Sequence, residues 1–209
     1  MSLILTNWPL AFVCSAMVVA AVIDGWKLKV PNWLTFPLIL SGWALGLYND
    51  AARWMLDSGW MAGEGGIGAA LAGTCLGFLL LLPIYSIGGM GAGDVKMQMG
   101  FGAWIGAFYG FGTELSQTQS GALGILTSAF CLAVVIGGFL AVGMIIVRGQ
   151  YRRNLTNTRQ ILGDLFQASS VGEVADKAAK RKPRMHLLPY GIPLCLGFIS
   201  YLTFWPRLF

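Results

Sequence analysis

Six apolar runs separated by short polar segments constrain this chain more than any other feature of its sequence. An α-helix needs about 20 mostly apolar residues to cross a bilayer, and the runs approach this length, although the second and fourth are short. Only 11% of the 209 residues are charged, whereas soluble domains average about 25%. The sequence therefore predicts an all-α integral membrane protein with a single membrane domain over residues 1–209. The predicted spans are Leu3–Ile23, Trp33–Tyr48, Ile67–Ile87, Val95–Phe111, Gly121–Val147 and Leu187–Trp205.

The distribution of Lys and Arg predicts which loops face the cytoplasm, because short cytoplasmic loops are enriched in these residues. Loops 24–32 and 148–186 carry an excess of them, with nine basic against three acidic residues in the second, and Lys96 follows loop 88–94. The two intervening loops together contain a single Arg. We therefore expect these three loops on the cytoplasmic side and both termini on the opposite side.

Loop 148–186 is the only predicted loop long enough to form a soluble appendage. Its Ile161, Leu162, Leu165 and Phe166 have the spacing of a helix that lies on the membrane surface. Its basic end, "KAAKRKPR", suits contact with anionic membrane lipids. A solvated linker that merely follows the charge bias explains the same residues equally well.

Two acidic residues, Asp24 and Asp94, lie at or inside span boundaries on the predicted cytoplasmic side. An Asp at the start of a helix, such as Asp94, can simply be an N-cap. Asp24 ends a helix, where the macrodipole disfavours a carboxylate, although an interfacial Asp can also reach water. Ionisable residues at membrane depth indicate function, and the topology makes each carboxylate the partner of the other.

Paired carboxylates point to general acid–base hydrolysis of a peptide bond. Two carboxylates a few ångströms apart cannot both ionise, so they share one proton. The charged member takes a proton from water while the neutral member hydrogen-bonds the scissile carbonyl, without a covalent intermediate.

The segment "GGMGAGD" at 88–94 places four glycines directly before Asp94. Glycine allows a sharp turn and close approach to a substrate strand, and we expect this loop to become ordered when substrate binds. Pro31 fixes a turn just beyond Asp24, and Asn32 either caps the second span or simply begins it. Glycines within the spans, such as Gly73 and Gly77, indicate close helix packing.

Other chemistries find little support in the sequence. Segment 88–94 has neither the Gly-Lys-Ser/Thr end of a P-loop nor the third glycine of a dinucleotide fingerprint. The four cysteines lie far apart, and the single histidine, His186, fits the basic loop better than a metal site. We expect no metal or other cofactor, and the net charge of +5 does not indicate nucleic-acid binding.

Three motifs, in order along the chain, resemble the prepilin peptidases, a branch of the G-x-G-D membrane aspartic peptidases. They are "GAGD" at 91–94 followed by "VKM", "IDGWKLKVPNWLT" at 23–35, and "LPYGIPLCLGF" at 188–198. The resemblance covers all six predicted spans. The chain lacks the CxxC-containing insert of the branch that also methylates its product. It therefore looks like the short peptidase of tight-adherence (Flp-type) pilus systems.

The resemblance implies a multi-pass protein of the bacterial inner membrane with Asp24 and Asp94 as the catalytic pair. By their positions in the motifs, Gly91 and Gly93, with Lys96, Pro31 and Asn32, would shape the loops around the pair or meet the substrate. The implied substrates are small prepilins and pseudopilins whose basic leader is cut at the cytoplasmic face, with the pilus-assembly machinery as a further partner. A small transporter and a non-catalytic assembly scaffold are the alternatives, although no inverted repeat is visible and neither Asp lies at the predicted midplane.

Overall fold

The described part of the chain, in a computed structural model, forms six α-helices and contains no strand. The described residues are 8–27, 29–55, 63–86, 88–111, 121–148 and 190–204. The helices are α2 (Trp8–Lys27), α3 (Asn32–Met55), α4 (Ile67–Ser86), α5 (Ala92–Tyr109), α6 (Ala122–Arg148) and α9 (Gly191–Phe204). The prediction of an all-helical fold is confirmed.

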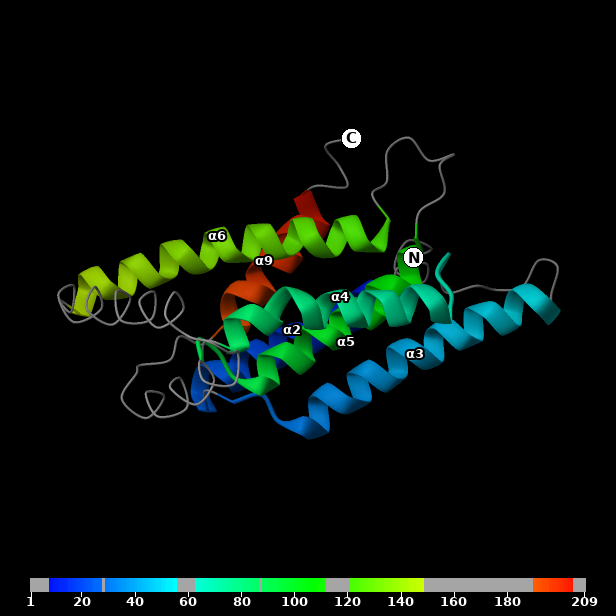
Figure 1. Cartoon of the computed structure of the whole chain (residues 1–209), viewed down its shortest axis with the longest axis horizontal. Helices are drawn as coiled ribbons and strands as arrows, with labels where there is room; N and C mark the ends of the chain where they lie inside the picture. Colours follow the sequence, from blue (N-terminus) through cyan, green and yellow to red (C-terminus); the bar gives the residue numbers. More distant parts are fainter. Residues whose placement is uncertain are drawn as a thin grey trace, which may run out of the picture.

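Successive helices run in opposite directions, so that α3, α5 and α9 are parallel to one another and antiparallel to α2, α4 and α6 (Figure 1). Helix α5 lies at the centre, where it contacts α2, α3, α4 and α6, and most of its residues are buried. The starts of α3, α5 and α9 therefore lie at the same end of the bundle as the end of α2.

Glycines bring α4 and α5 into direct backbone contact. A Cβ atom on Gly73 would lie 2.1 Å from the carbonyl oxygen of Gly102, and one on Gly77 would lie 2.5 Å from that of Gln98. Small residues at such spacing allow helices to pack closely when lipid offers no hydrophobic force between them. The prediction that Gly73 and Gly77 serve helix packing is confirmed.

Helix α3 is seven residues longer at its C-terminal end than the predicted span, which ended at Tyr48. The added residues begin with Asn49 and Asp50, whose side chains bond to backbone groups of neighbouring segments. The buried Asn49 amide donates to the carbonyl oxygens of Gly65 (2.9 Å) and Ala107 (3.0 Å). Asp50 accepts from the N–H of Ile67 (2.8 Å) at the start of α4. A hydropathy pattern does not show such bonds, which explains why the predicted second span was too short.

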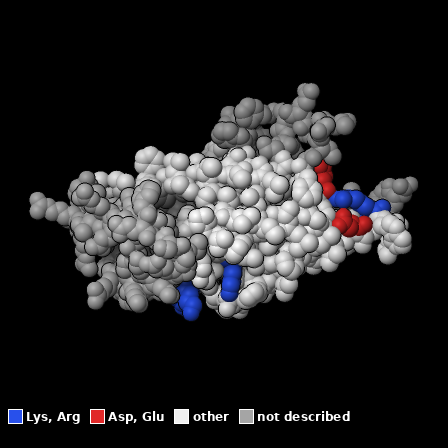
Figure 2. Space-filling model, viewed as in Figure 1, with Lys and Arg blue, Asp and Glu red and all other residues white. Residues whose placement is uncertain are grey.

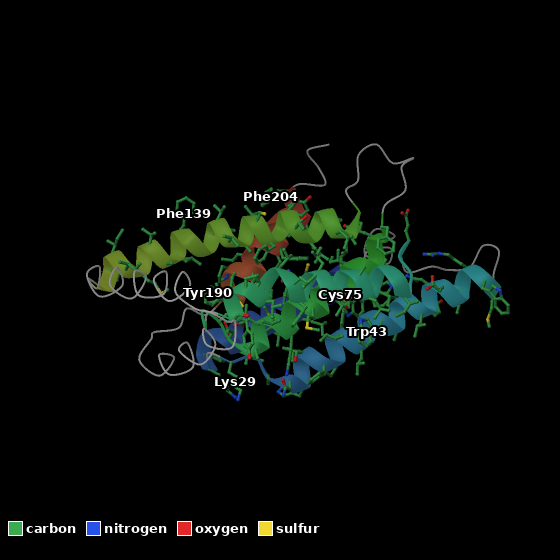
Figure 3. All side chains as sticks on the ribbon, in the orientation of Figure 1. Lys29, Trp43, Cys75, Phe139, Tyr190 and Phe204 are labelled. Atoms are coloured by element: carbon green, nitrogen blue, oxygen red, sulfur yellow. The ribbon has the colours of Figure 1, made fainter. Side chains whose placement is uncertain are left out.

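Most of the described surface is uncharged on the face shown in Figure 2, where acidic side chains gather at the right end and basic side chains lie there and along the lower edge. Apolar side chains point outward instead, and Phe139 of α6 is 76% exposed (Figure 3). Among the described helices, three are long and apolar enough to cross a membrane: α2, α4 and α6. Helix α9 is a shorter apolar helix over its described residues. The chain is a membrane protein by these criteria.

Two predicted boundaries differ in ways that affect the site. Helix α2 extends past Ile23 to Lys27, so Asp24 lies in its last turn. Helix α5 begins at Ala92, three residues before the predicted start, so Asp94 lies within the helix and the preceding loop is shorter than 88–94. The predicted starts of the first and last spans, and most of loop 148–186 with His186, lie outside the described residues.

Candidate active site

Asp24 is buried in the last turn of α2, with 2% of its surface exposed. Its Oδ2 atom accepts a hydrogen bond from the backbone N–H of Gly191, the first residue of α9, at 2.9 Å. The N-terminus of a helix offers free N–H groups and a positive partial charge, both of which stabilise a carboxylate. The start of α9 thus offsets the unfavourable position of Asp24 at the end of its own helix.

Asp94 lies in the first turn of α5 and is also buried, at 5% exposure. It is not the N-cap, because that position is occupied by Gly91 in an extended conformation. Instead, the Oδ2 atom of Asp94 reaches back to accept from the N–H of Gly91 at 3.2 Å. An acidic residue three positions after the cap commonly satisfies the cap N–H in this way. The N-cap interpretation of Asp94 is therefore wrong.

Tyr190 connects the surroundings of the two carboxylates. It directly precedes Gly191, which bonds Asp24, and its phenol lies within electrostatic reach of the Asp94 carboxylate. Figure 3 shows Tyr190 at the beginning of α9, toward the same end of the bundle as Lys29. The two acidic residues thus lie at one end of the bundle, where Gly191 bonds Asp24 and Tyr190 lies within electrostatic reach of Asp94.

The segment between α2 and α3 lies directly on the first turn of α5. A Cβ atom on Gly93 would lie 2.7 Å from the carbonyl oxygen of Val30. No side chain larger than hydrogen fits there without movement of one of the two backbones. Gly93 therefore sets the distance between the chain that follows Asp24 and the helix turn that carries Asp94.

A second connection, between the start of α3 and the first turns of α5, involves Pro31, Asn32 and Lys96. The Pro31 carbonyl oxygen accepts from the N–H groups of Leu34 and Thr35, so Asn32 begins α3 and Pro31 precedes it as the cap. The Asn32 Oδ1 atom accepts from Lys96 Nζ at 3.0 Å, and the same ammonium lies 4.7 Å from the ring centre of Phe36. Lys96 thus holds the start of α3 against the first turns of α5.

The four glycines before Asp94 have separate structural roles. Gly88 has a positive φ of 77°, and the N–H groups of Gly88 and Gly89 bond to the carbonyl oxygens of Tyr85 and Ile84, which ends α4. Such closure by glycine is common at helix C-termini. Gly91 caps α5 and Gly93 lies inside it.

Sequence reasoning did not single out Tyr190 and Gly191. The only signal was the motif "LPYGIPLCLGF", which contains both residues. The structure explains why residue 191 is a glycine, since a Cβ atom there would lie 3.0 Å from Asp24 Oδ2. Among the described residues, no group of three or more His, Cys, Asp or Glu is placed to hold a metal ion.

The sequence pattern of the type IV leader peptidase family matches residues 11–146, which include Asp24 and Asp94 and about two thirds of the chain. Comparisons with curated proteins and with solved structures gave no match. The match agrees with the resemblance found in the motifs around both carboxylates. The chain is a member of the type IV leader peptidase family.

Proposed function

We propose that this protein is an aspartic endopeptidase of the bacterial inner membrane that removes the basic leader of Flp-type prepilins and pseudopilins at the cytoplasmic face. The observation that carries the proposal is the placement of two buried carboxylates, Asp24 and Asp94, at one end of the helix bundle beside the start of α9. Family membership supports a leader-type substrate.

In the proposed reaction the two carboxylates hold one proton between them. The ionised carboxylate removes a proton from water, which attacks the scissile carbonyl, while the protonated carboxylate donates a hydrogen bond to the carbonyl oxygen. The carboxylate that took the proton from water then gives it to the amide nitrogen, the C–N bond breaks, and the new amino end of the peptide departs. No residue forms a covalent bond to the substrate, so no nucleophilic Ser or Cys is required.

The orientation is supported by the charges at the two ends of the bundle. Lys27, Lys29 and Lys96 lie at the end that carries the two carboxylates, whereas Asp50 and Glu64 lie at the other end. Basic residues mark the cytoplasmic side of membrane proteins. With six alternating helices as spans, both termini would face the non-cytoplasmic side. The absence of the CxxC-containing insert supports a peptidase without methyltransferase activity.

Co-expression with small prepilins from the same genome tests the proposal, with leader removal read from the mass of the pilin. The wild type should cleave at least one of them, and Asp24→Asn and Asp94→Asn should each reduce cleavage to a few per cent or less, because an amide cannot share the proton. Asp50→Asn, at the opposite end, is the matched control and should retain cleavage. Efficient cleavage by either Asp24→Asn or Asp94→Asn would rule out the paired-acid mechanism.

A further inference from the structure

Gln98 is a fully buried amide in α5 with 0% exposure. Neither its Nε2 nor its Oε1 atom has a hydrogen-bond partner within the described part of the chain, and Gln98 alone among those residues has two such atoms. An amide that is buried without partners costs free energy, and this cost is larger in a membrane protein because no water is at hand. Such a group in a native structure calls for an explanation.

The position of Gln98 along α5 supplies one. Asp94, Gln98 and Phe101 are spaced by four and three residues, so their side chains form one stripe along the helix. Tyr190 lies within electrostatic reach of Asp94 at one end of this stripe, and Phe198 contacts Phe101 at the other, with 5.6 Å between ring centres. Phe101 therefore points toward α9, and Gln98 lies on the same side of α5, one turn from Asp94 and beside the backbone contact of α5 with Gly77 of α4.

The direction of the side chain brings the amide closer to the candidate active site. Side chains on a helix lean toward its N-terminus, so the Gln98 amide extends toward the turn that contains Asp94. A Gln amide has donors and an acceptor in one plane. These match the C=O and N–H of a peptide group, which offers one acceptor and one donor.

We propose that Gln98 binds a main-chain peptide group of the substrate, close to the scissile bond, when the substrate enters between α5 and α9. This proposal rests on the proposed peptidase function. Because Gln98 is fully covered in this structure, the helices around it must separate at its level to admit the strand. Its uncompensated amide favours that separation, since the peptide group supplies the hydrogen bonds that the closed bundle lacks.

Gln98→Met is the test variant, because Met is apolar and of similar length and volume. The matched control is Met97→Leu, since Met97 is equally buried on the same turn but carries no amide. Purified wild type and both variants are compared in leader cleavage and in thermal unfolding. Gln98→Met should unfold at the same or a higher temperature than wild type, while its kcat/KM falls about tenfold or more, chiefly through KM. Met97→Leu should retain wild-type kcat/KM.

Substrates with one backbone amide near the cleavage site replaced by an ester distinguish a direct contact from an effect on opening. At one position the ester should lower kcat/KM for the wild type and have little further effect on Gln98→Met. Equal losses in both enzymes at every position would overturn the proposal. So would unchanged kcat/KM in Gln98→Met, or a loss that accompanies a lower unfolding temperature. If the wild type cleaves no prepilin, the proposed peptidase function fails, and the proposal for Gln98 fails with it. If the wild type cleaves and Gln98→Met cleaves equally well, only the proposal for Gln98 fails.

Discussion

The Oδ2 atom of Asp24 lies 2.9 Å from the backbone nitrogen of Gly191, although 167 residues separate them in the sequence. This hydrogen bond joins the end of α2 to the start of α9 and fixes one oxygen of a buried carboxylate. It also requires that residue 191 lack a side chain, because any Cβ atom there would touch the carboxylate.

Replacement of Gly191 by Ala should impair leader cleavage strongly. The new Cβ atom would lie 3.0 Å from both Cβ and Oδ2 of Asp24, so the carboxylate must move away from its bond to the helix start. Loss of position by about 1 Å can cost about 100-fold in rate. The cleavage rate of purified protein measures the effect, and we expect a decrease of at least tenfold.

Gly25→Ala is the control for this variant. Gly25 neighbours Asp24 and also faces α9, but its Cβ atom would lie 3.5 Å from the Ile192 side chain, an ordinary contact distance. We expect cleavage close to that of wild type. A similar loss in both variants would show that α9 tolerates no added atom at this level, and the specific role of Gly191 would be wrong.

Gly93→Ala should lower both the unfolding temperature and the cleavage rate, whereas Gly91→Ala should keep the unfolding temperature of wild type. The difference follows from space: a Cβ atom on Gly93 meets the Val30 backbone at 2.7 Å, whereas one on Gly91 has 3.5 Å to its nearest neighbour. Overpacking of this kind costs about 1–3 kcal/mol in the free energy of unfolding. If both variants unfold as wild type does, the segment after α2 is not held against α5 as described.

Gly73→Ala should destabilise the contact between α4 and α5 without a direct effect on the carboxylates. The added atom would lie 2.1 Å from the Gly102 carbonyl oxygen, so the helices must separate, at a cost of about 1–3 kcal/mol or more. Gly138→Ala in α6 is the matched control, because nothing lies within 4 Å of its Cβ position. Thermal unfolding in detergent measures both, and equal unfolding temperatures would contradict the close contact.

Lys96→Met and Asn32→Ala should affect cleavage through the same contact. Each removes the hydrogen bond between Lys96 Nζ and Asn32 Oδ1, which is exposed and therefore contributes about 1 kcal/mol or less to stability. If Lys96 acts by positioning the start of α3, the double variant should lose little more activity than Lys96→Met alone. Additive losses would instead indicate that Lys96 meets the substrate directly.

The sequence allowed prediction of the helical fold and of the end of the bundle where both carboxylates lie. Those features depend on local quantities: the length of the apolar runs and the side on which Lys and Arg gather. The close packing of Gly73 and Gly77 was likewise evident, because small residues four apart in an apolar helix are typical of close contact with a neighbouring helix.

The partners of the carboxylates could not be predicted in the same way. The bond from Gly191 to Asp24 depends on the register between α2 and α9, which packing across the whole bundle determines. The start of α5 was also not predicted, because the composition of Gly91, Ala92 and Gly93 is typical of a loop. In the structure Gly93 is helical, and the chain at Val30 crosses it there. Gln98 gave no signal, since one amide in an apolar run is not unusual.

The glycine contacts between α4 and α5 divide the bundle into parts that can and cannot move relative to each other. Where the backbones of α4 and α5 touch, no side chain can change its rotamer to accommodate a movement. If one helix slid along the other by one residue, a Cβ atom would collide with a carbonyl group. The α4–α5 pair, which carries Asp94, is therefore held together by direct backbone contact, while the Asp24–Gly191 bond joins α2 to α9. Asp24 and Asp94 therefore belong to different pairs of helices, and any movement of one acid relative to the other would have to pass through the contact where Val30 packs on Gly93.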